Sequence, residues 1–122
     1  MKAVDIINRF MTHSEDDVRE VVVDGKTIYI RRLTAAEFSD IVFYENQARD
    51  KELSASDRRN AEQCKFATAF KYSLCDEDGK QLFDNSDFDA LKNRFDARAA
   101  ILIYSHIINF NMPSDLELKK KN

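Results

Sequence analysis

Most apolar residues of this chain recur at the three- and four-residue spacing of an amphipathic helix. Near the start, Val4, Ile7 and Met11 follow this spacing and predict a short helix, which a polar stretch over residues 13–17 ends. The same periodicity returns repeatedly further along the chain. The predicted helices cover residues 3–12, about 35–52, about 57–75, a short segment that Ser86 caps, and about 96–111.

Residues 18–31 interrupt the helical pattern with two runs rich in β-branched residues. Asp24 and Gly25 stand between the runs, and this pair favours a type I′ turn, which needs positive φ at both central positions. The sequence therefore predicts a hairpin in which Val23 pairs with Lys26. The residues that this register places on one face, to be covered by helices or by another subunit, are Val21, Val23, Ile28 and Ile30.

Capping residues mark where the predicted helices begin and end. Thr34 and Glu37 fit a capping box, in which each side chain accepts a hydrogen bond from the backbone amide of the other residue. Ser54 fits the N-cap of the next helix and predicts a polar break over residues 53–56. Pro113 is expected to end the last helix, because proline disfavours helix in the residue before it.

Two of the predicted helices carry broad apolar faces. The helix over 96–111 is apolar almost all round, and we expect it to be central. The helix over 57–75 has a wide stripe that suggests contacts on more than one side. Its predicted inner face consists of Ala61, Cys64, Ala67, Thr68, Phe70 and Leu74, with Phe66, Ala69 and Tyr72 beside it.

The segment over residues 73–83 combines an apolar helix end, an acidic turn and an apolar return. Asp76 and Gly79 suit the first and fourth positions of a type I turn, since a carboxylate accepts the free amides and glycine tolerates positive φ. A calcium loop counted from Asp76 would need glycine sixth and glutamate twelfth, where Gln81 and Asp87 stand. An ordinary acidic turn is therefore predicted.

The composition favours a mainly helical protein. With two Gly, one Pro, nine Phe and 43% hydrophobic residues, the chain has few breaks and enough apolar volume for a core. We predict a mainly α fold, a small helical domain of four to five helices with one N-terminal β-hairpin at about 18–31. We expect one domain over 1–122, with a mobile N-terminal segment over 1–17 and a polar C-terminal tail over 113–122.

Charge and cysteine content limit the classes of protein to which the chain can belong. The 19 basic and 22 acidic residues are mixed along the chain, so the basic face that nucleic acid requires is not expected. Cys64 and Cys75 fall within one predicted helix, roughly 16 Å apart and too far for a disulfide. The longest apolar run, residues 99–104, is far below the ~20 residues of a membrane span, and we expect a soluble, intracellular protein.

No constellation for catalysis emerges. His13 and His106 each lack a second histidine or cysteine at ligand spacing, and they suit a solvated and a core histidine respectively. Arg58 and Arg59, and the lysines over 119–121, suit a solvated surface better than a nucleic-acid site. We therefore predict no catalytic, metal-binding or cofactor-binding residues and no enzyme activity.

The surplus of aromatic and apolar side chains is the positive clue. These side chains point around more than one side of their helices, so some of them must be exposed, meet a second copy or meet another protein. Any single one also fits a core position. The candidate residues for a partner or self-association surface are Phe38, Ile41, Phe43, Tyr44, Phe66, Phe70 and Tyr72.

Over roughly residues 18–122, the chain resembles the tail assembly chaperones of long-tailed, siphovirus-type bacteriophages. No single motif carries the resemblance, which rests on the order of several; residues 1–17 fall outside it. The segments concerned are the hairpin end Ile30–Thr34, the turn Ser73–Gly79 with Leu82–Phe83, and the helix end Ile107–Asn109 before a short Lys/Asn tail.

The resemblance implies a function without catalysis. It implies a homo-oligomer in the host cell cytoplasm that binds the helix-rich tape measure protein, keeps it soluble and helps to recruit tail tube protein, and that is absent from the mature virion. It also implies a longer form made by programmed frameshifting, which would recruit the tube protein. Lys119–Asn122 is compatible with a slippery run of adenines, and equally with a basic solvated tail.

Two other functional classes remain open at this stage. A structural or head–tail connector protein would stay in the finished virion. A small regulatory protein that binds nucleic acid would show a salt-dependent shift of DNA or RNA, and the charge balance makes this class the weakest.

Overall fold

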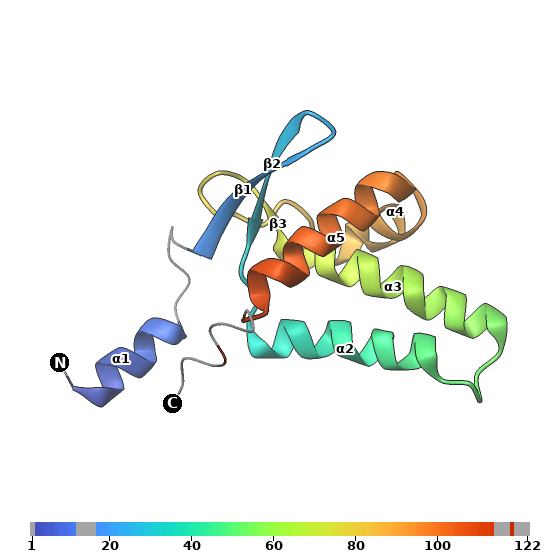
Figure 1. The fold of residues 1–122 in the computed structure, drawn as a ribbon, viewed down its shortest axis with the longest axis horizontal. Helices are drawn as coiled ribbons and strands as arrows, with labels where there is room; N and C mark the ends of the chain where they lie inside the picture. The colour runs from blue at the N-terminus through green and yellow to red at the C-terminus, as the bar shows by residue number, and fades with distance from the viewer. Residues whose placement is uncertain (1, 12–16, 114–117, 119–122) are drawn as a thin grey trace.

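The computed structural model describes residues 2–11, 17–113 and 118, and it has the predicted fold class (Figure 1). Helices dominate, and the N-terminal hairpin gains a short third strand. The elements are α1 (Ala3–Phe10), β1 (Val18–Val23), β2 (Lys26–Arg31), α2 (Ala35–Arg49), α3 (Ala55–Ser73), β3 (Leu74–Cys75), the 3-10 helix η2 (Asn85–Asp87), α4 (Phe88–Asn93) and α5 (Ala97–Asn111).

The hairpin forms in the predicted register. Val23 pairs with Lys26, and the turn residues Asp24 and Gly25 have φ values of 50° and 77°, the left-handed conformations of a type I′ turn. Val21 and Ile30 are buried, so the predicted inner face is the covered one. Local turn chemistry thus fixes which side chains of the hairpin meet the helices.

The strand β3 is a correction to the predicted helix over 57–75. The helix ends at Ser73, and Cys75 pairs with Tyr29 on the free edge of β2. The buried Ser73 hydroxyl donates a hydrogen bond of 2.8 Å to the Arg31 carbonyl, which holds the helix end against the strand. The two cysteines therefore lie on different elements, and both are buried free thiols.

The helices α2 and α3 run side by side as a helical hairpin (Figure 1). The predicted capping box forms, with Thr34 Oγ1 accepting from the Glu37 amide and Glu37 Oε1 accepting from the Thr34 amide. Glu37 Oε2 also accepts from Arg31 Nη2 at 3.0 Å and so joins β2 to the start of α2. α2 ends at Arg49, earlier than predicted, and Ser54 caps α3 as predicted.

The acidic turn forms as predicted. The Gly79 amide donates to the Asp76 carbonyl at 3.0 Å, and Asp76 Oδ1 accepts from the amides of Asp78 and Lys80. The predicted cap at Ser86 is wrong, because the cap is Asp84, two residues earlier, whose carboxylate accepts from the Ser86 amide at the start of η2. A charged acceptor at this position satisfies the free amides better than a hydroxyl.

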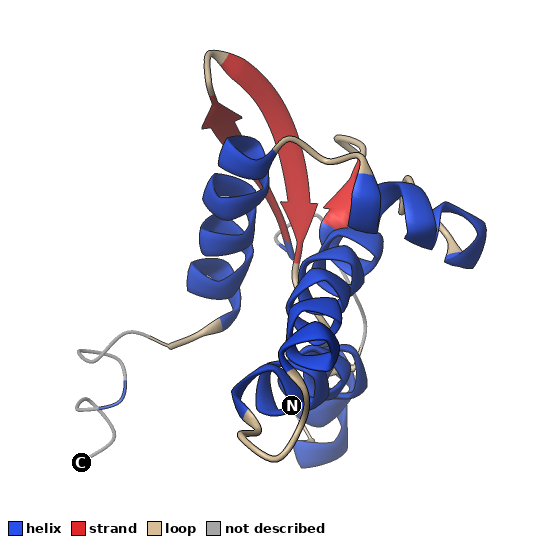
Figure 2. Cartoon of the chain, turned by 90° about the vertical axis from the view of Figure 1, so that its right-hand side faces the viewer, coloured by secondary structure: helices blue, strands red, loops and turns tan. Residues whose placement is uncertain are grey.

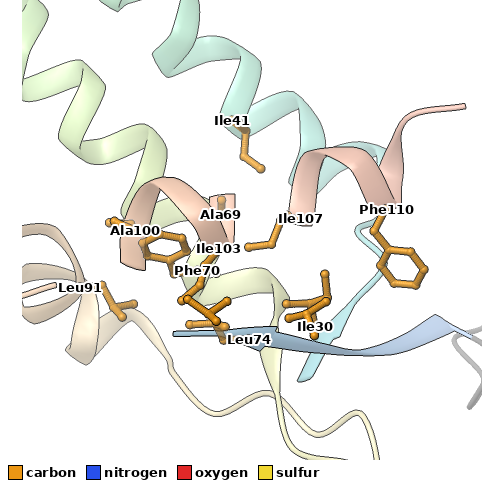
Figure 3. Packing of buried hydrophobic residues seen from close by; sticks show 13 residues of the cluster. Ile30, Ile41, Ala69, Phe70, Leu74, Leu91, Ala100, Ile103, Ile107 and Phe110 are labelled. Carbon is orange, nitrogen blue, oxygen red and sulfur yellow. The ribbon is translucent and has the colours of Figure 1, made fainter. Parts of the chain in front are cut away.

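The core lies between α5, α3 and the sheet, where Ile103 and Ile107 of α5 approach Phe70 and Ile30 (Figure 3). Figure 2 shows α5 running alongside the strands. Ile101, in contrast, is 62% exposed, so α5 is not buried on all sides as its composition suggested. The helix ends at Asn111, and the extended backbone of Met112 leads to Pro113 as expected.

Candidate partner-binding surface

The structure divides the predicted surface residues between the core and two separate faces. Ile41 and Phe70 have 1% and 0% of their surface exposed and lie in the core, where Figure 3 labels both. They cannot contact a partner directly, because their side chains pack in the core. Phe43 is 56% exposed, and the remaining residues are half-buried: Phe38, Tyr44, Phe66 and Tyr72.

Phe43, Tyr44 and Tyr72 meet at a hollow between α2 and α3, here called the α2–α3 groove. The groove has a volume of about 420 Å³, and its lining residues are Asp40, Phe43, Tyr44, Thr68, Lys71, Tyr72 and Phe88. The Phe43 and Tyr44 rings pack edge to face with centroids 5.3 Å apart. This arrangement holds the largely exposed Phe43 ring beside the groove.

Polar groups form one side of the α2–α3 groove. Tyr72 Oη donates a hydrogen bond of 2.7 Å to Asp40 Oδ2, which joins α3 to α2. This bond, together with burial, raises the pKa of Tyr72 to about 12, so the hydroxyl stays protonated at neutral pH. Lys71 Nζ lies 4.5 Å from the centre of the Tyr72 ring. The groove therefore combines aromatic rings with fixed polar groups.

Phe66 lies on the other side of α3, where that helix faces α5. Its ring packs edge to face with Tyr104 at 4.9 Å, and Lys65 Nζ lies 5.1 Å from its centre. Burial raises the pKa of Tyr104 to about 12. A hollow of about 430 Å³ adjoins this cluster, lined in part by Leu91 and Ile101. Apart from Phe38 and the buried Phe70, the predicted aromatic residues thus lie on two faces rather than on one continuous surface.

A third apolar hollow was not predicted as a site. It lies where β2 extends past the end of β3, and we call it the sheet-edge groove. It has a volume of about 500 Å³ and is lined by Thr27, Ile28, Tyr29, Leu74, Cys75, Asp76, Glu77, Leu82, Phe83, Phe95 and Ile103. Leu82 is 55% exposed, and burial is the main cause that raises the pKa of the Cys75 thiol to about 11. The apolar return at Leu82 and Phe83 was the sequence signal for this groove.

The apolar face of α1 was also not predicted as a binding surface, although the helix itself was. No residue of α1 is buried. Ile7 is 55% exposed, Phe10 83% and Met11 71%, and all three lie on the same side of the helix. A helix of this length gains little from its own hydrogen bonds in water. Its apolar face is exposed, although Phe10 and Met11 line a hollow with Leu33.

No group of three His, Cys, Asp or Glu side chains in the described part of the chain could hold a metal ion. His106 is half-buried on α5, whereas His13 and the lysines over 119–121 lie outside the described residues. None of the described helices is long and apolar enough to cross a membrane.

Fold and surface together define a small helical protein with a three-stranded sheet and several apolar grooves. No protein-family model matches the chain, and no curated protein matches it. Among solved structures, the chain is similar to the tail assembly chaperone of bacteriophage HK97, with a TM-score of 0.59 and 15% sequence identity. The similarity covers 86% of this chain and 99% of that chain. The chain therefore shares the fold of that structure.

Proposed function

We propose that this chain is a non-enzymatic tail assembly chaperone of a bacteriophage. In this proposal it binds the tape measure protein in the host cytoplasm, keeps it soluble, and is absent from the finished virion. The observation that carries the proposal is the shared fold, which extends over 99% of the HK97 chaperone despite 15% identity. The partly exposed aromatic residues of α2 and α3 give that fold a surface suited to another chain's apolar helix.

The α2–α3 groove is the proposed client site. An amphipathic client helix would lay its apolar face on Phe43 and Tyr44, as in other helix-in-groove complexes. Asp40 and Lys71 at the same groove offer one charge of each sign to polar residues beside the client's apolar stripe. The packing of α2 against α3 and the hydrogen bond from Tyr72 to Asp40 hold the two helices together, which supports a preorganised groove.

Binding and release need only mass action. A single groove of this size covers one short stretch of a client helix, so stable coverage of a long client requires many copies. Tail tube subunits that compete for the same client would then displace the chaperone without nucleotide hydrolysis. We propose that a longer, frameshifted form of the chain recruits the tube protein. This form would have the same sequence as the present chain up to the site of the frameshift.

Co-expression tests the proposed function. The tape measure protein of the same phage should be insoluble alone and soluble with this chain, and the two should co-purify. Equal insolubility with and without the chain would overturn the proposal. Detection of the chain in purified virions at structural stoichiometry would instead favour the connector class.

The longer form has its own test in the gene. A slippery heptamer near the codons for Lys119–Asn122, with an overlapping downstream frame, would support it. A nucleotide sequence that lacks both would remove the longer form, while leaving the tape measure proposal intact.

A further inference from the structure

Two arginines at the open end of the hairpin lie over the same aromatic ring. Arg19 Cζ is 4.2 Å from the centre of the Phe110 ring, and Arg32 Cζ is 4.9 Å from it. Both arginines are exposed, whereas the Phe110 side chain beneath them is buried. We call these three residues the arginine patch. Figure 3 shows the Phe110 ring at the end of α5.

The register of the hairpin places both arginines on its inner face. Arg19 pairs with Ile30, and the Arg32 amide donates to the Asp17 carbonyl just beyond the two strands. Residues two apart on a strand share a face, so Arg19 and Arg32 are diagonal neighbours on the side where Val21 is buried. Positive charge therefore replaces the apolar face of the sheet at the point where α5 ends.

The side chain of Asn111 fixes the aromatic ring beside Arg32. Asn111 Oδ1 accepts a hydrogen bond of 2.8 Å from the Leu33 amide. The residue after Phe110 is thus tied to the residue after Arg32. Because the fold already holds the ring and the backbone of Arg32 together, little further ordering of the patch is needed when a ligand binds.

The arginine patch has no acidic partner in the described part of the chain. The neighbouring Arg31 pairs with Glu37 at 3.0 Å, whereas no described carboxylate lies within ion-pair distance of Arg19 or Arg32. Glu20, next to Arg19 in the sequence, is on the opposite face of the strand. Like charges held at one ring repel each other, and a bound anion would relieve this repulsion.

An apolar hollow adjoins the patch at Arg32. It has a volume of about 440 Å³ and is lined by Arg9, Phe10, Met11, Asp17, Arg32, Leu33, Thr34 and Ala35. Asp17 is the one acid among these described lining residues, and it has an interaction partner of its own. Positive charge beside an apolar hollow suits a protein segment that has both acidic and apolar side chains. It suits the uniform phosphates of nucleic acid less well.

We propose that the arginine patch binds an acidic segment of another protein. A carboxylate of this segment pairs with Arg19 and Arg32, and a neighbouring apolar side chain enters the hollow beside Leu33. Carboxylates match the patch because a guanidinium presents paired N–H donors in one plane, and packing of its face on a ring leaves those donors accessible. The patch shares no residue with the α2–α3 groove, so this contact can fail while the proposed function stands, and the reverse.

A peptide array tests the patch with the full chain. Its peptides combine Glu or Asp with Leu or Phe in every order, and each has a counterpart with Gln or Asn in place of the acids. The wild-type chain should bind some acidic peptides at least about tenfold more tightly than their neutral counterparts, and high salt should reduce this preference. An array that shows no such preference would overturn the proposal.

Paired substitutions assign the preference to the patch. Arg19→Gln with Arg32→Gln should remove it, and Arg19→Lys with Arg32→Lys should weaken it, because lysine keeps the charge without the paired donors. Arg59→Gln with Arg94→Gln makes the same change in net charge at exposed positions and should preserve it. Circular dichroism checks that all variants are folded. An equal loss of preference in the two Gln pairs would refute the assignment.

Three further results would identify a different occupant and overturn the proposal. A DNA oligonucleotide that binds the patch more tightly than every peptide would indicate a nucleic-acid site. Asp115 and Glu117 follow α5 in the sequence and lie outside the described residues. Peptide binding only after Asp115→Asn with Glu117→Gln would show that the chain's own tail occupies the patch. A lower mass of the Arg19→Gln, Arg32→Gln variant in light scattering without peptide would indicate a second copy.

Discussion

Tyr72 on α3 donates a 2.7 Å hydrogen bond to Asp40 on α2, and both residues line the groove that we assign to the client helix. The two residues stand 32 positions apart in the sequence. Because the bond joins the two helices of the groove, its loss should affect both stability and the shape of the site. The bond also raises the pKa of Tyr72, which can be measured by titration at alkaline pH.

Replacing Tyr72 by Phe should remove this late-ionising hydroxyl from the titration. The bond and burial raise the pKa of Tyr72 from 10.0 to about 12, so the stability it contributes is full below pH 10 and is lost as the pH rises through about 12. The pKa values of all four tyrosines are raised, but only those of Tyr72 and Tyr104 reach about 12, so ultraviolet titration should show these two ionising last, and Tyr72→Phe should leave one of them. At neutral pH the variant should lose about 0.5–1.5 kcal/mol. Unchanged late ionisation in Tyr72→Phe would contradict the assignment.

Replacing Gly79 by Ala should destabilise the acidic turn. Gly79 has a φ of +86°, and an added Cβ would come within 2.9 Å of Val18 Cγ2. Strain and overpacking together should cost about 2–5 kcal/mol in chemical unfolding. Gly25→Ala is the matched control, since its φ is +77° but nothing lies within 4 Å of the added Cβ, and it should cost only about 1–2 kcal/mol. Equal losses for the two variants would show that contact with Val18 is unimportant.

Replacing Asn111 by Ala should loosen the end of α5. Asn111 Oδ1 accepts from the Leu33 amide at 2.8 Å, and Nδ2 donates to the Ile107 carbonyl, so this side chain joins α5 to the start of α2. Leaving the partly buried amide without its acceptor should cost about 1–3 kcal/mol. Thermal unfolding of Asn109→Ala, an exposed neighbour on the same helix, should change by no more than about 0.5 kcal/mol. A smaller loss in Asn111→Ala than in this control would refute the assignment.

Substitutions at Phe70 and Phe43 should distinguish a residue that stabilises the fold from one that is available for binding. Phe70 is fully buried and packs against Phe95 with centroids 4.5 Å apart, so Phe70→Ala should cost about 3–5 kcal/mol. Phe43 is 56% exposed, and Phe43→Ala should change the free energy of unfolding by less than about 1 kcal/mol. Urea unfolding of both variants checks this contrast, and similar losses would mean that Phe43 is part of the core.

Signals that act over a few residues predicted the fold well. Asp24 and Gly25 determine the hairpin register through their positive φ, and Thr34 with Glu37 fixes the start of α2. The strand β3 escaped prediction because Leu74 and Cys75 continue a helical pattern in sequence. They form a strand because they pair with the free edge of β2, which lies far away in sequence.

The binding surface was harder to predict, because helical spacing shows on which side of a helix a side chain lies but not how deeply the fold buries it. Phe43 on α2 is 56% exposed, whereas Phe70 on α3 is fully buried in the core, where it packs against Phe95. The apolar face of α1 was visible in the sequence. Its lack of a buried contact became apparent only once the positions of the other elements were known.

The most direct test of the client-binding account is a titration of the purified chain with amphipathic helical peptides from the tape measure protein of the same phage. The account predicts saturable binding by the wild-type chain, about tenfold or more weaker binding by Phe43→Ser, and unchanged binding by Val22→Ser. Val22 is a matched control, because it is 61% exposed and lines none of the grooves described above. Absent binding, or equal affinity of Phe43→Ser and the wild type, would contradict the account.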